Sequence, residues 1–384
     1  MTKVNVIADN IITSLGFTSK ENIENIKLGV SGIHVCNDIN LSPEIFSLSM
    51  VNTDILNEKF VRIANKDKAN YTRFEKLIIL SVSDVLKKCD IDVENKETLI
   101  IISTTKGNID LLNEAESRKY GKDRIHLWAA AKEVQIFFNN PNTPIIISNA
   151  CISGVLAINT GTQLIKSDLY KNVIVAGADI ISQFVVSGFQ SFKSLSPKMC
   201  KPFDKDRDGL TLGEGAGCII LSADDNKNKD VITIIGGGCN NDANHISGPS
   251  RTGEGLYLSI KSALSESGFS SEEIEFISAH GTATEYNDEM ESIAISRHNM
   301  EKIPANSLKG YWGHTLGAAG IIESVATIHS LRENVLLPTF GYKNHGVSKN
   351  INIVHQLEKK VINNCLKIAS GFGGCNAAIV FTKN

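Results

Sequence analysis

The sequence contains no long apolar run, no low-complexity tract and no proline- or glycine-rich linker. No stretch is long enough to span a bilayer, which takes about 20 apolar residues in a helix. The first residues, MTKVNV, lack the basic segment and apolar run of a secretory signal peptide. The formal net charge is −3, with no basic stripe that would suit a nucleic acid. We therefore expect a cytoplasmic protein with neither a membrane nor a nucleic acid as partner.

The cysteines lack any pattern as well. They lie at positions 36, 89, 151, 200, 218, 239, 365 and 375, without a CxxC pair or a Cys/His cluster at the spacing of zinc ligands. Scattered thiols of this kind are typical of a reducing compartment, where most cysteines are buried as small apolar side chains. We expect reduced thiols and no metal site.

The chain does have enough apolar sequence for a large core, because 42% of its 384 residues are hydrophobic and 21% are charged. Apolar runs of strand length alternate with longer amphipathic stretches, a pattern typical of an α/β fold with buried, mostly parallel strands. We expect strands at Leu99–Ser103, Pro144–Ser148, Val173–Ala178, Val231–Ile235, Ile274–Ser278, Leu366–Ser370 and Ala377–Phe381. We expect helices at Arg73–Lys88, Ile152–Lys166, Tyr257–Ser267, Asp288–Arg297 and Leu316–Leu331.

Two halves of the chain share this alternation of strands and helices. The polar run Asn226–Asp230 separates them, so we place the boundary between residues 1–229 and 230–384. An internal duplication fits this organisation, although no repeat of individual residues supports it.

One cysteine, Cys151, follows an expected strand and precedes an expected helix. A helix N-terminus carries free N–H groups and a positive dipole end, which favour a thiolate and can also bind an oxyanion. Gly154 lets the first helical turn pack closely. The alternative is a buried, inert thiol, as most cysteines are. The strand–turn–helix context resembles a nucleophile elbow and favours a reactive cysteine.

Two histidines also lie where apolar runs give way to small residues. His280 follows the strand that ends at Ser278, and His314 precedes a helix rich in small residues, with Lys309 five positions before it. Ends of parallel strands share one edge of a sheet, where ligands bind. A metal site lacks compact ligand spacing here, and a Cys–His–Asp protease lacks the acidic residue that orients its histidine.

A glycine-rich turn, Gly371-Phe372-Gly373-Gly374, connects the last two expected strands. With this turn, the sequence resembles the elongating β-ketoacyl-acyl-carrier-protein synthases of the thiolase superfamily over nearly its whole length. The matching motifs are Ala150-Cys151, His280-Gly281-Thr282-Ala283-Thr284, Lys309 with Gly313-His314-Thr315, the Phe372 turn, and Lys201-Pro202-Phe203-Asp204-Lys205-Asp206-Arg207-Asp208-Gly209 continuing to Gly213-Glu214-Gly215-Ala216-Gly217.

This resemblance implies a fold of two duplicated halves in five layers, αβαβα, with two mixed sheets, usually as a homodimer. It also implies that Cys151 and both histidines meet between the halves. The substrates are acyl and malonyl thioesters whose phosphopantetheine arm belongs to an acyl carrier protein, so no further cofactor is expected.

The resemblance further implies a role for each site residue. Cys151 carries the acyl group, His280 and His314 stabilise the enolate formed by decarboxylation, and Lys309 positions the histidines. Further roles fall to Phe372 (oxyanion binding and gating), Thr282 and Thr284 (pantetheine), Glu323 (partner of Lys309) and Ile109 (acyl pocket). Buried ion pairing is the role expected for Arg207, Asp208 and Glu214.

Several positions depart from the family pattern. Ile152 follows the nucleophile where a small residue is usual, Thr105–Ile109 replaces a glycine-rich run, and Ser370 stands where phenylalanine is common. These departures favour a specialised polyene or polyketide pathway over bulk fatty-acid synthesis. Alternatives are a thiolase acting on CoA thioesters, for which Cys375 could be a second cysteine, and one subunit of a heterodimer with a paralogue that lacks the nucleophile.

Overall fold

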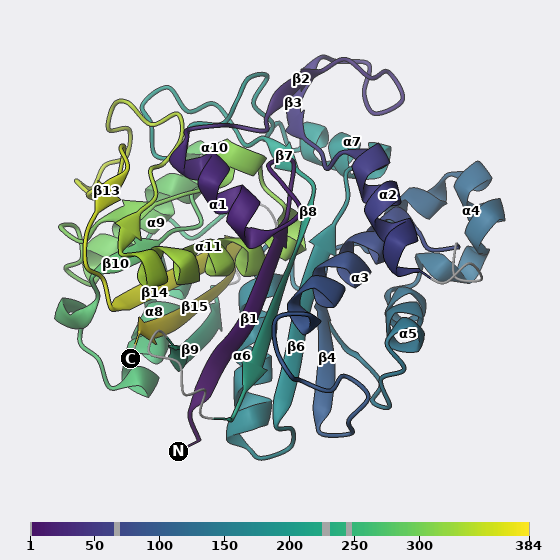
Figure 1. Cartoon of the computed structure of the whole chain (residues 1–384). Helices are drawn as coiled ribbons and strands as arrows, with labels where there is room; N and C mark the ends of the chain where they lie inside the picture. The colour runs from purple at the N-terminus through teal and green to yellow at the C-terminus, as the bar shows by residue number, and fades with distance from the viewer. Residues whose placement is uncertain (1, 65–69, 225–230, 243–247, 384) are drawn as a thin grey trace.

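Ten strands form one large mixed sheet (Figure 1). The computed structural model describes residues 2–64, 70–224, 231–242 and 248–383. The strands of the sheet are, in spatial order, β11 (Ala305–Asn306), β10 (Phe276–Ser278), β14 (Asn364–Gly371), β15 (Cys375–Lys383), β9 (Ile232–Asn241), β1 (Val4–Ile12), β8 (Gly215–Ser222), β6 (Asn172–Asp179), β4 (Thr98–Ser103) and β5 (Ile145–Ile147).

The same strand order occurs twice in this sheet. From the middle outward, one half runs β1-β8-β6-β4-β5 and the other β9-β15-β14-β10-β11, with matching parallel and antiparallel pairs. The inner strands β1 and β9 pair antiparallel, with Val4 opposite Ile234 and Val6 opposite Ile232. The expected two mixed sheets are therefore joined edge to edge. The predicted boundary at Asn226–Asp230 lies outside the described residues.

Eleven α-helices are described within these ranges. They are α1 (Ser19–Lys27), α2 (Thr53–Ile63), α3 (Arg73–Leu86), α4 (Glu114–Tyr120), α5 (Leu127–Phe137), α6 (Ser153–Lys166), α7 (Gln183–Ser191), α8 (Glu254–Ser267), α9 (Glu285–Arg297), α10 (Lys309–Trp312) and α11 (Ala319–Glu333). Short 3-10 helices are η2 (Ile109–Leu112), η3 (Lys122–Ile125), η4 (Ser271–Glu273) and η5 (Leu316–Ala318). The remaining small strands are β2 (His34–Cys36), β3 (Phe46–Ser49), β7 (Leu212–Gly213), β12 (Val335–Leu336) and β13 (Glu358–Lys359).

Three buried apolar clusters stack these helices against the sheet in five layers. The central cluster joins α6 and α11 to strands of both halves. A second cluster packs α3 and α5 on the outer face of the first half, and a third packs α8 and α9 on the outer face of the second. Alternate residues of one strand pack into the clusters on opposite faces of the sheet, because successive side chains of a strand point to opposite faces. In β6, Val173 and Val175 face the centre, whereas Ile174 faces outward.

Helices α6 and α11 approach each other very closely in the central layer. A β-carbon on Gly154 would lie 2.7 Å from the backbone nitrogen of Ile321 and 3.0 Å from Cα of Gly320. The prediction that Gly154 allows close packing is therefore confirmed. This contact brings together the helix that follows Cys151 and the helix that follows His314.

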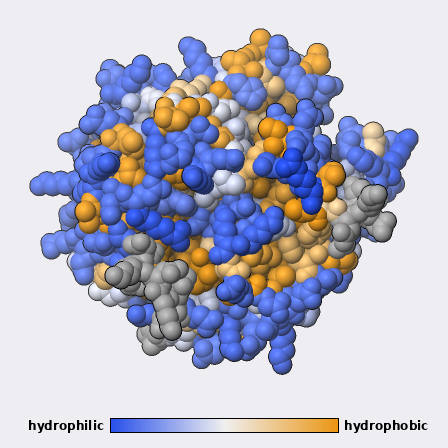
Figure 2. Space-filling view, in the orientation of Figure 1, coloured by the Kyte–Doolittle hydropathy of each residue, from blue (hydrophilic) through white to orange (hydrophobic). Residues whose placement is uncertain are grey.

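The surface carries a few exposed apolar groups. Figure 2 shows mostly hydrophilic residues on the visible face, with apolar groups near the top at the β2–β3 hairpin. Val35, Ile39 and Ile45 of this hairpin are exposed. No helix of the described chain has the length and apolar character needed to cross a membrane.

Candidate active site

Cys151 lies in a tight turn between β5 and α6, as the sequence predicts. Ala150 adopts a φ of 45°, a left-handed conformation that costs about 1–2 kcal/mol in residues other than glycine. The Ser153 hydroxyl accepts a hydrogen bond from Asn149 N (2.8 Å) and donates one to Ala150 O (2.6 Å). These two bonds hold the strained turn and fix the position of the cysteine.

His280 lies in a loop held by two buried acids of α9. Glu291 accepts hydrogen bonds from the backbone N–H groups of His280 (2.7 Å) and Gly281 (2.6 Å), and Asp288 accepts one from Thr282 N (2.9 Å). Burial raises the pKa of Glu291 to about 7. Neither acid was predicted from the sequence, although their spacing of three places them on one face of a helix.

His314 follows a glycine that no other residue could replace without a clash. Gly313 has a φ of 72°, and a β-carbon there would lie 2.6 Å from Leu212 O. The backbone N–H of His314 donates to Thr211 O at 2.7 Å, which ties the histidine to the strand region before β7. The expected helix at Leu316 starts as the 3-10 turn η5 and becomes α-helical at Ala319.

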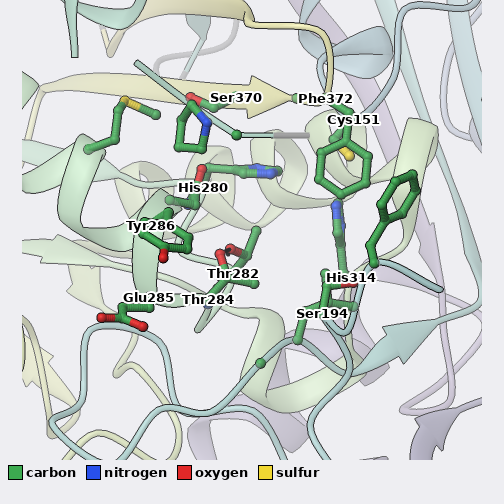
Figure 3. A pocket seen from close by; sticks show the side chains of 18 of the residues that line it. Cys151, Ser194, His280, Thr282, Thr284, Glu285, Tyr286, His314, Ser370 and Phe372 are labelled. Carbon is green, nitrogen blue, oxygen red and sulfur yellow. Dashed lines mark hydrogen bonds between the residues drawn. The ribbon is translucent and has the colours of Figure 1, made fainter. Parts of the chain in front are cut away.

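The three predicted reactive residues converge, as Figure 3 shows. Cys151 Sγ and one ring nitrogen each of His280 and His314 lie within 4.8 Å of one another, and all three side chains are buried. The two imidazole rings are nearly perpendicular, at 83°, with centroids 5.1 Å apart. Cys151 thus joins in one reactive cluster two histidines that lie more than 120 positions after it.

Burial shifts the pKa values of these groups in opposite directions. The pKa of His280 and of His314 is held well below its usual value, by burial first and then by the charge of Lys309. Burial raises the pKa of the Cys151 thiol to about 12. The sequence pattern favours a thiolate at the helix terminus, whereas burial of the thiol acts against the charged form. All three groups are neutral at pH 7.

Lys309 contacts the first histidine directly. Its Nζ lies 3.2 Å from His280 Nδ1 and 2.5 Å from His280 O, and it forms a buried ion pair with Glu323. The predicted pairing of Lys309 and Glu323 is confirmed. An ammonium donates but cannot accept, so His280 Nδ1 is the acceptor and its proton lies on Nε2. His314 Nδ1 is buried without a hydrogen-bond partner among the described residues.

A second buried lysine, Lys367 of β14, was not predicted from the sequence. Its Nζ donates to Glu323 Oε2 at 2.6 Å and to the backbone oxygens of Ser278 (3.3 Å) and Ala279 (3.2 Å). Its side chain is fully buried. The available sequence signal is a lysine in the middle of an otherwise apolar strand.

A cavity of about 490 Å³ leads to this cluster. Thr282 and Thr284 line it, and their hydroxyls are 2.8 Å apart. In Figure 3 Phe372 lies at the Cys151 end and Glu285 at the other end, with the two threonines between. Ile109 is absent from the residues lining this cavity, so its role in an acyl pocket stays a prediction.

Phe372 belongs to an aromatic cluster with two residues of the α7 region. Its ring centroid lies 5.8 Å from that of Phe189 and 5.4 Å from that of Phe192. Ile109 packs against the same apolar cluster as Phe372. Movement of Phe372 therefore requires these aromatic contacts to break.

Of the three charged residues expected to form buried ion pairs, one does so. Glu214 binds Arg73 of α3, with Nε to Oε1 at 2.9 Å. Asp208 instead accepts from the hydroxyl of Ser196. Arg207 donates to backbone carbonyl oxygens and lines the cavity. Ion pairing as the role of Arg207 and Asp208 is wrong, because backbone and hydroxyl partners take its place.

Cys151, His280 and His314 also form the one group within the described ranges whose donors could share a metal ion. Sequence spacing was therefore a poor argument against a metal here, since the fold joins distant loops. Two ammonium groups, of Lys309 and Lys367, lie behind the histidines and oppose a further cation. The absence of a metal stays a prediction.

Models of two protein domains match the sequence over most of its length. The N-terminal domain of β-ketoacyl synthases matches residues 1–227, and the C-terminal domain matches residues 231–343. A putative mitochondrial 3-oxoacyl-[acyl-carrier-protein] synthase of Schizosaccharomyces pombe is 32% identical, over 81% of this chain and 81% of that protein. The 3-oxoacyl-[acyl-carrier-protein] synthase 2 of Rhizobium meliloti is 33% identical over 67% of this chain and 65% of that protein.

Solved structures show the same fold. The ketosynthase ApeO of Xenorhabdus doucetiae, in complex with its chain length factor ApeC, has a TM-score of 0.89 and 26% identity, covering 100% of this chain and 98% of that one. A β-ketoacyl synthase of Burkholderia phymatum has a TM-score of 0.82 at 23% identity, with full coverage of both chains.

Proposed function

This chain belongs to the β-ketoacyl synthase family, and on that premise we propose that it is a 3-oxoacyl-[acyl-carrier-protein] synthase. It is an acyltransferase that joins an acyl group to a malonyl thioester with loss of CO₂. The observation that carries the proposal is the buried cluster of one thiol and two neutral imidazoles within 4.8 Å, reached by a cavity.

In the first half-reaction, Cys151 takes the acyl group from a carrier thioester. Because its pKa is raised to about 12, the thiol must lose its proton as sulfur attacks. His280 Nδ1 is occupied by Lys309, so neutral His314 is the base for this proton. His314 then returns the proton to the departing pantetheine thiolate. The tetrahedral oxyanion is stabilised by the backbone N–H groups of Cys151 and Phe372.

In the second half-reaction, a malonyl thioester binds and its carboxylate leaves as CO₂. The electron pair of the broken bond forms an enolate, whose oxygen accepts hydrogen bonds from the N–H groups of His280 and His314. The enolate carbon attacks the acyl carbonyl on Cys151. The C–S bond breaks, the thiolate takes a proton from solvent, and a β-ketoacyl thioester is released.

The open part of the cavity suits the arm that carries both substrates. Thr282 and Thr284 present hydroxyls to it, and we assign them to the amide groups of the pantetheine. Phe372 gates the acyl pocket, held closed by Phe189 and Phe192. The phosphopantetheine arrives with the substrate, so the enzyme needs no cofactor of its own.

The proposal extends to partners and cellular role. An acyl carrier protein delivers the substrates, in keeping with the activity that gives the relatives their names. The chain acts as a dimer, either with a second copy or with a paralogue lacking the nucleophile, as ApeO pairs with a chain length factor. Fatty-acid or specialised polyketide synthesis in the cytoplasm is the corresponding role.

Intact mass spectrometry after incubation with a panel of acyl-carrier thioesters tests the nucleophile. We expect a mass gain equal to the acyl group, which is absent in Cys151→Ser. The matched control is Cys375→Ser, which removes another buried thiol and keeps the mass gain. Acylation that persists in Cys151→Ser would contradict the proposal.

A second assay distinguishes the reaction from that of a thiolase. We expect product and ¹⁴CO₂ only when a carboxyl-labelled malonyl thioester is supplied with the acylated enzyme. Condensation of acetyl-CoA alone, without CO₂ release, would replace the proposed function by a thiolase reaction.

A further inference from the structure

Lys367 is a fully buried charged residue to which neither half-reaction gives a role. It lies in the centre of β14, next to β10, with Lys367 opposite Ser278 in the parallel register. Burying an ammonium group costs desolvation free energy unless the group is hydrogen-bonded or paired. An uncharged side chain of similar size would fill the same space without that cost. Its presence in this buried position therefore calls for an electrostatic or positioning role.

The contacts of Lys367 lead directly to His280. Its Nζ binds the carbonyl oxygens of Ser278 and Ala279, and Lys309 Nζ binds that of His280 itself. Two ammonium groups thus hold three consecutive carbonyls that end at the catalytic imidazole. Both groups share a single carboxylate, that of Glu323.

We propose that Lys367 is a positioning residue for His280 in the malonyl half-reaction, a built-in cation that fixes the backbone of residues 278–280. This inference rests on the proposed function. It assigns the two lysines different contacts: Lys309 reaches the imidazole, and Lys367 reaches the backbone that carries it. Cys151 acylation depends on His314 and the oxyanion donors, so it does not require Lys367.

The charges around His280 agree with this assignment. Lys309, His314 and Lys367 each hold the pKa of His280 down, after burial. Glu323 lies behind both ammonium groups, and Glu291 binds the backbone N–H of His280. Two ammonium groups against the one carboxylate they share leave net positive charge behind the ring, which keeps it neutral.

The two half-reactions measured separately test the role of Lys367. In Lys367→Ala we expect the acyl group to be loaded onto Cys151 at near the wild-type rate. Intact mass spectrometry measures this loading. Decarboxylation of malonyl-pantetheine by the acylated enzyme should fall by about 100-fold in kcat, the size typical of a small misplacement of a catalytic group. Lys367→Met, which keeps the volume of the aliphatic part of the side chain, should lose decarboxylation as Lys367→Ala does. Lys367→Arg, which keeps the positive charge, should retain more of this activity.

Chemical rescue separates a positioning role from a merely structural one. Lys367→Ala leaves a space lined by the Glu323 carboxylate and two carbonyl oxygens, ligands that suit a monovalent cation. Ammonium chloride should restore decarboxylation by about 10-fold, a part of the loss expected from misplacement. Tetramethylammonium chloride at equal ionic strength should not restore decarboxylation, because the cation is too large for the space.

The pH profile gives an independent readout. Removing the charge of Lys367 raises the pKa of His280, so the imidazole protonates at higher pH. The acid limb of kcat for decarboxylation should therefore move to higher pH in Lys367→Met. The control is Lys383→Ala in the neighbouring strand β15. The ammonium group of Lys383 binds Leu331 O and the Asn334 side chain and none of the carbonyls of residues 278–280, so this substitution should leave the acid limb in place.

Three outcomes would overturn the inference. One is a folded Lys367→Met enzyme, checked by circular dichroism, with wild-type decarboxylation. Another is an equal loss of both half-reactions without rescue by ammonium, which indicates a structural residue. The last is a wild-type enzyme that loads acyl groups but releases no CO₂, in which case the proposed function fails and the inference fails with it.

Discussion

At the scale of single residues, burial decides the chemistry of the site. It disfavours the charged form of every group, so it lowers the pKa of the two histidines and raises that of the thiol. The reactive trio is therefore neutral at rest. Lys309 and Lys367 lie near it, and both form ion pairs with Glu323.

The depressed pKa values of His280 and His314 predict how activity depends on pH. Decarboxylation needs neutral imidazoles that donate an N–H group, and an ordinary histidine is half protonated near pH 6.5. Here the rate should stay constant as the pH falls through about 6.5, and decline only below it. The measurement is kcat for malonyl-pantetheine decarboxylation between mildly alkaline and acid pH, with circular dichroism to verify folding. An acid limb at the ordinary histidine pKa would contradict the assigned environment.

The sequence identifies Cys151, His280 and His314 because each lies beside small residues at the end of an apolar segment. It does not identify Lys367 or Glu291, because their partners belong to other elements and only the strand order makes them neighbours. The raised pKa of the Cys151 thiol was not predicted for a related reason. A helix terminus is visible in the sequence, whereas the depth of burial around it is a property of the whole fold.

At the scale of elements, tight turns place the reactive groups. Left-handed residues stand next to all three of them: Ala150 before Cys151, Gly281 after His280 and Gly313 before His314. For Ala150, which is not a glycine, this conformation is strained, and strain of this kind concentrates at functional sites. Apolar periodicity predicted β4, β6, β14, α3, α6 and α11 to within a few residues, but it did not predict β1, β8, α2 or α5, and it ended β9 six residues too early. It missed the 3-10 turn at Leu316–Ala318, because packing rather than periodicity sets that geometry.

Close contact of α6 and α11 predicts the effect of one added methyl group. Gly154→Ala would place a β-carbon 2.7 Å from Ile321 N, so the helices must separate. We expect a loss of about 1–3 kcal/mol in the free energy of unfolding, the usual cost of overpacking. Denaturant unfolding measures it, and slower acylation should accompany it because α6 follows Cys151.

The matched control is Gly188→Ala in α7, where a β-carbon meets nothing within 4 Å. There alanine should stabilise the protein by about 0.5–1 kcal/mol, through the better helix propensity of alanine. Equal effects of the two substitutions would refute the packing argument.

At the scale of the whole molecule, the two halves share one sheet and one central core. Cluster residues from both halves, such as Val155 and Ile379, pack in the same layer. The pattern of strands and helices predicted two similar halves, and the resemblance to the β-ketoacyl synthases implied the five layers. It could not predict that β1 and β9 pair, since strand register across 230 residues leaves no local signal.

The shared core predicts that neither half folds alone. Residues 1–230 and 231–384, expressed separately, would each expose the face of the central layer and an unpaired inner strand. We expect dye binding typical of exposed apolar surface, no near-ultraviolet circular dichroism and no cooperative unfolding. The full chain is the control, and a cooperative transition in either fragment would contradict the prediction.

The seam between β1 and β9 has the form of a subunit interface. Each half contributes its first strand, and the two run antiparallel, as two copies of a half-length chain would pair across a twofold axis. In evolutionary terms, fusing such copies frees them to diverge without losing the interface. One half holds Cys151 and the other holds His280 and His314, so a single asymmetric site needs both halves.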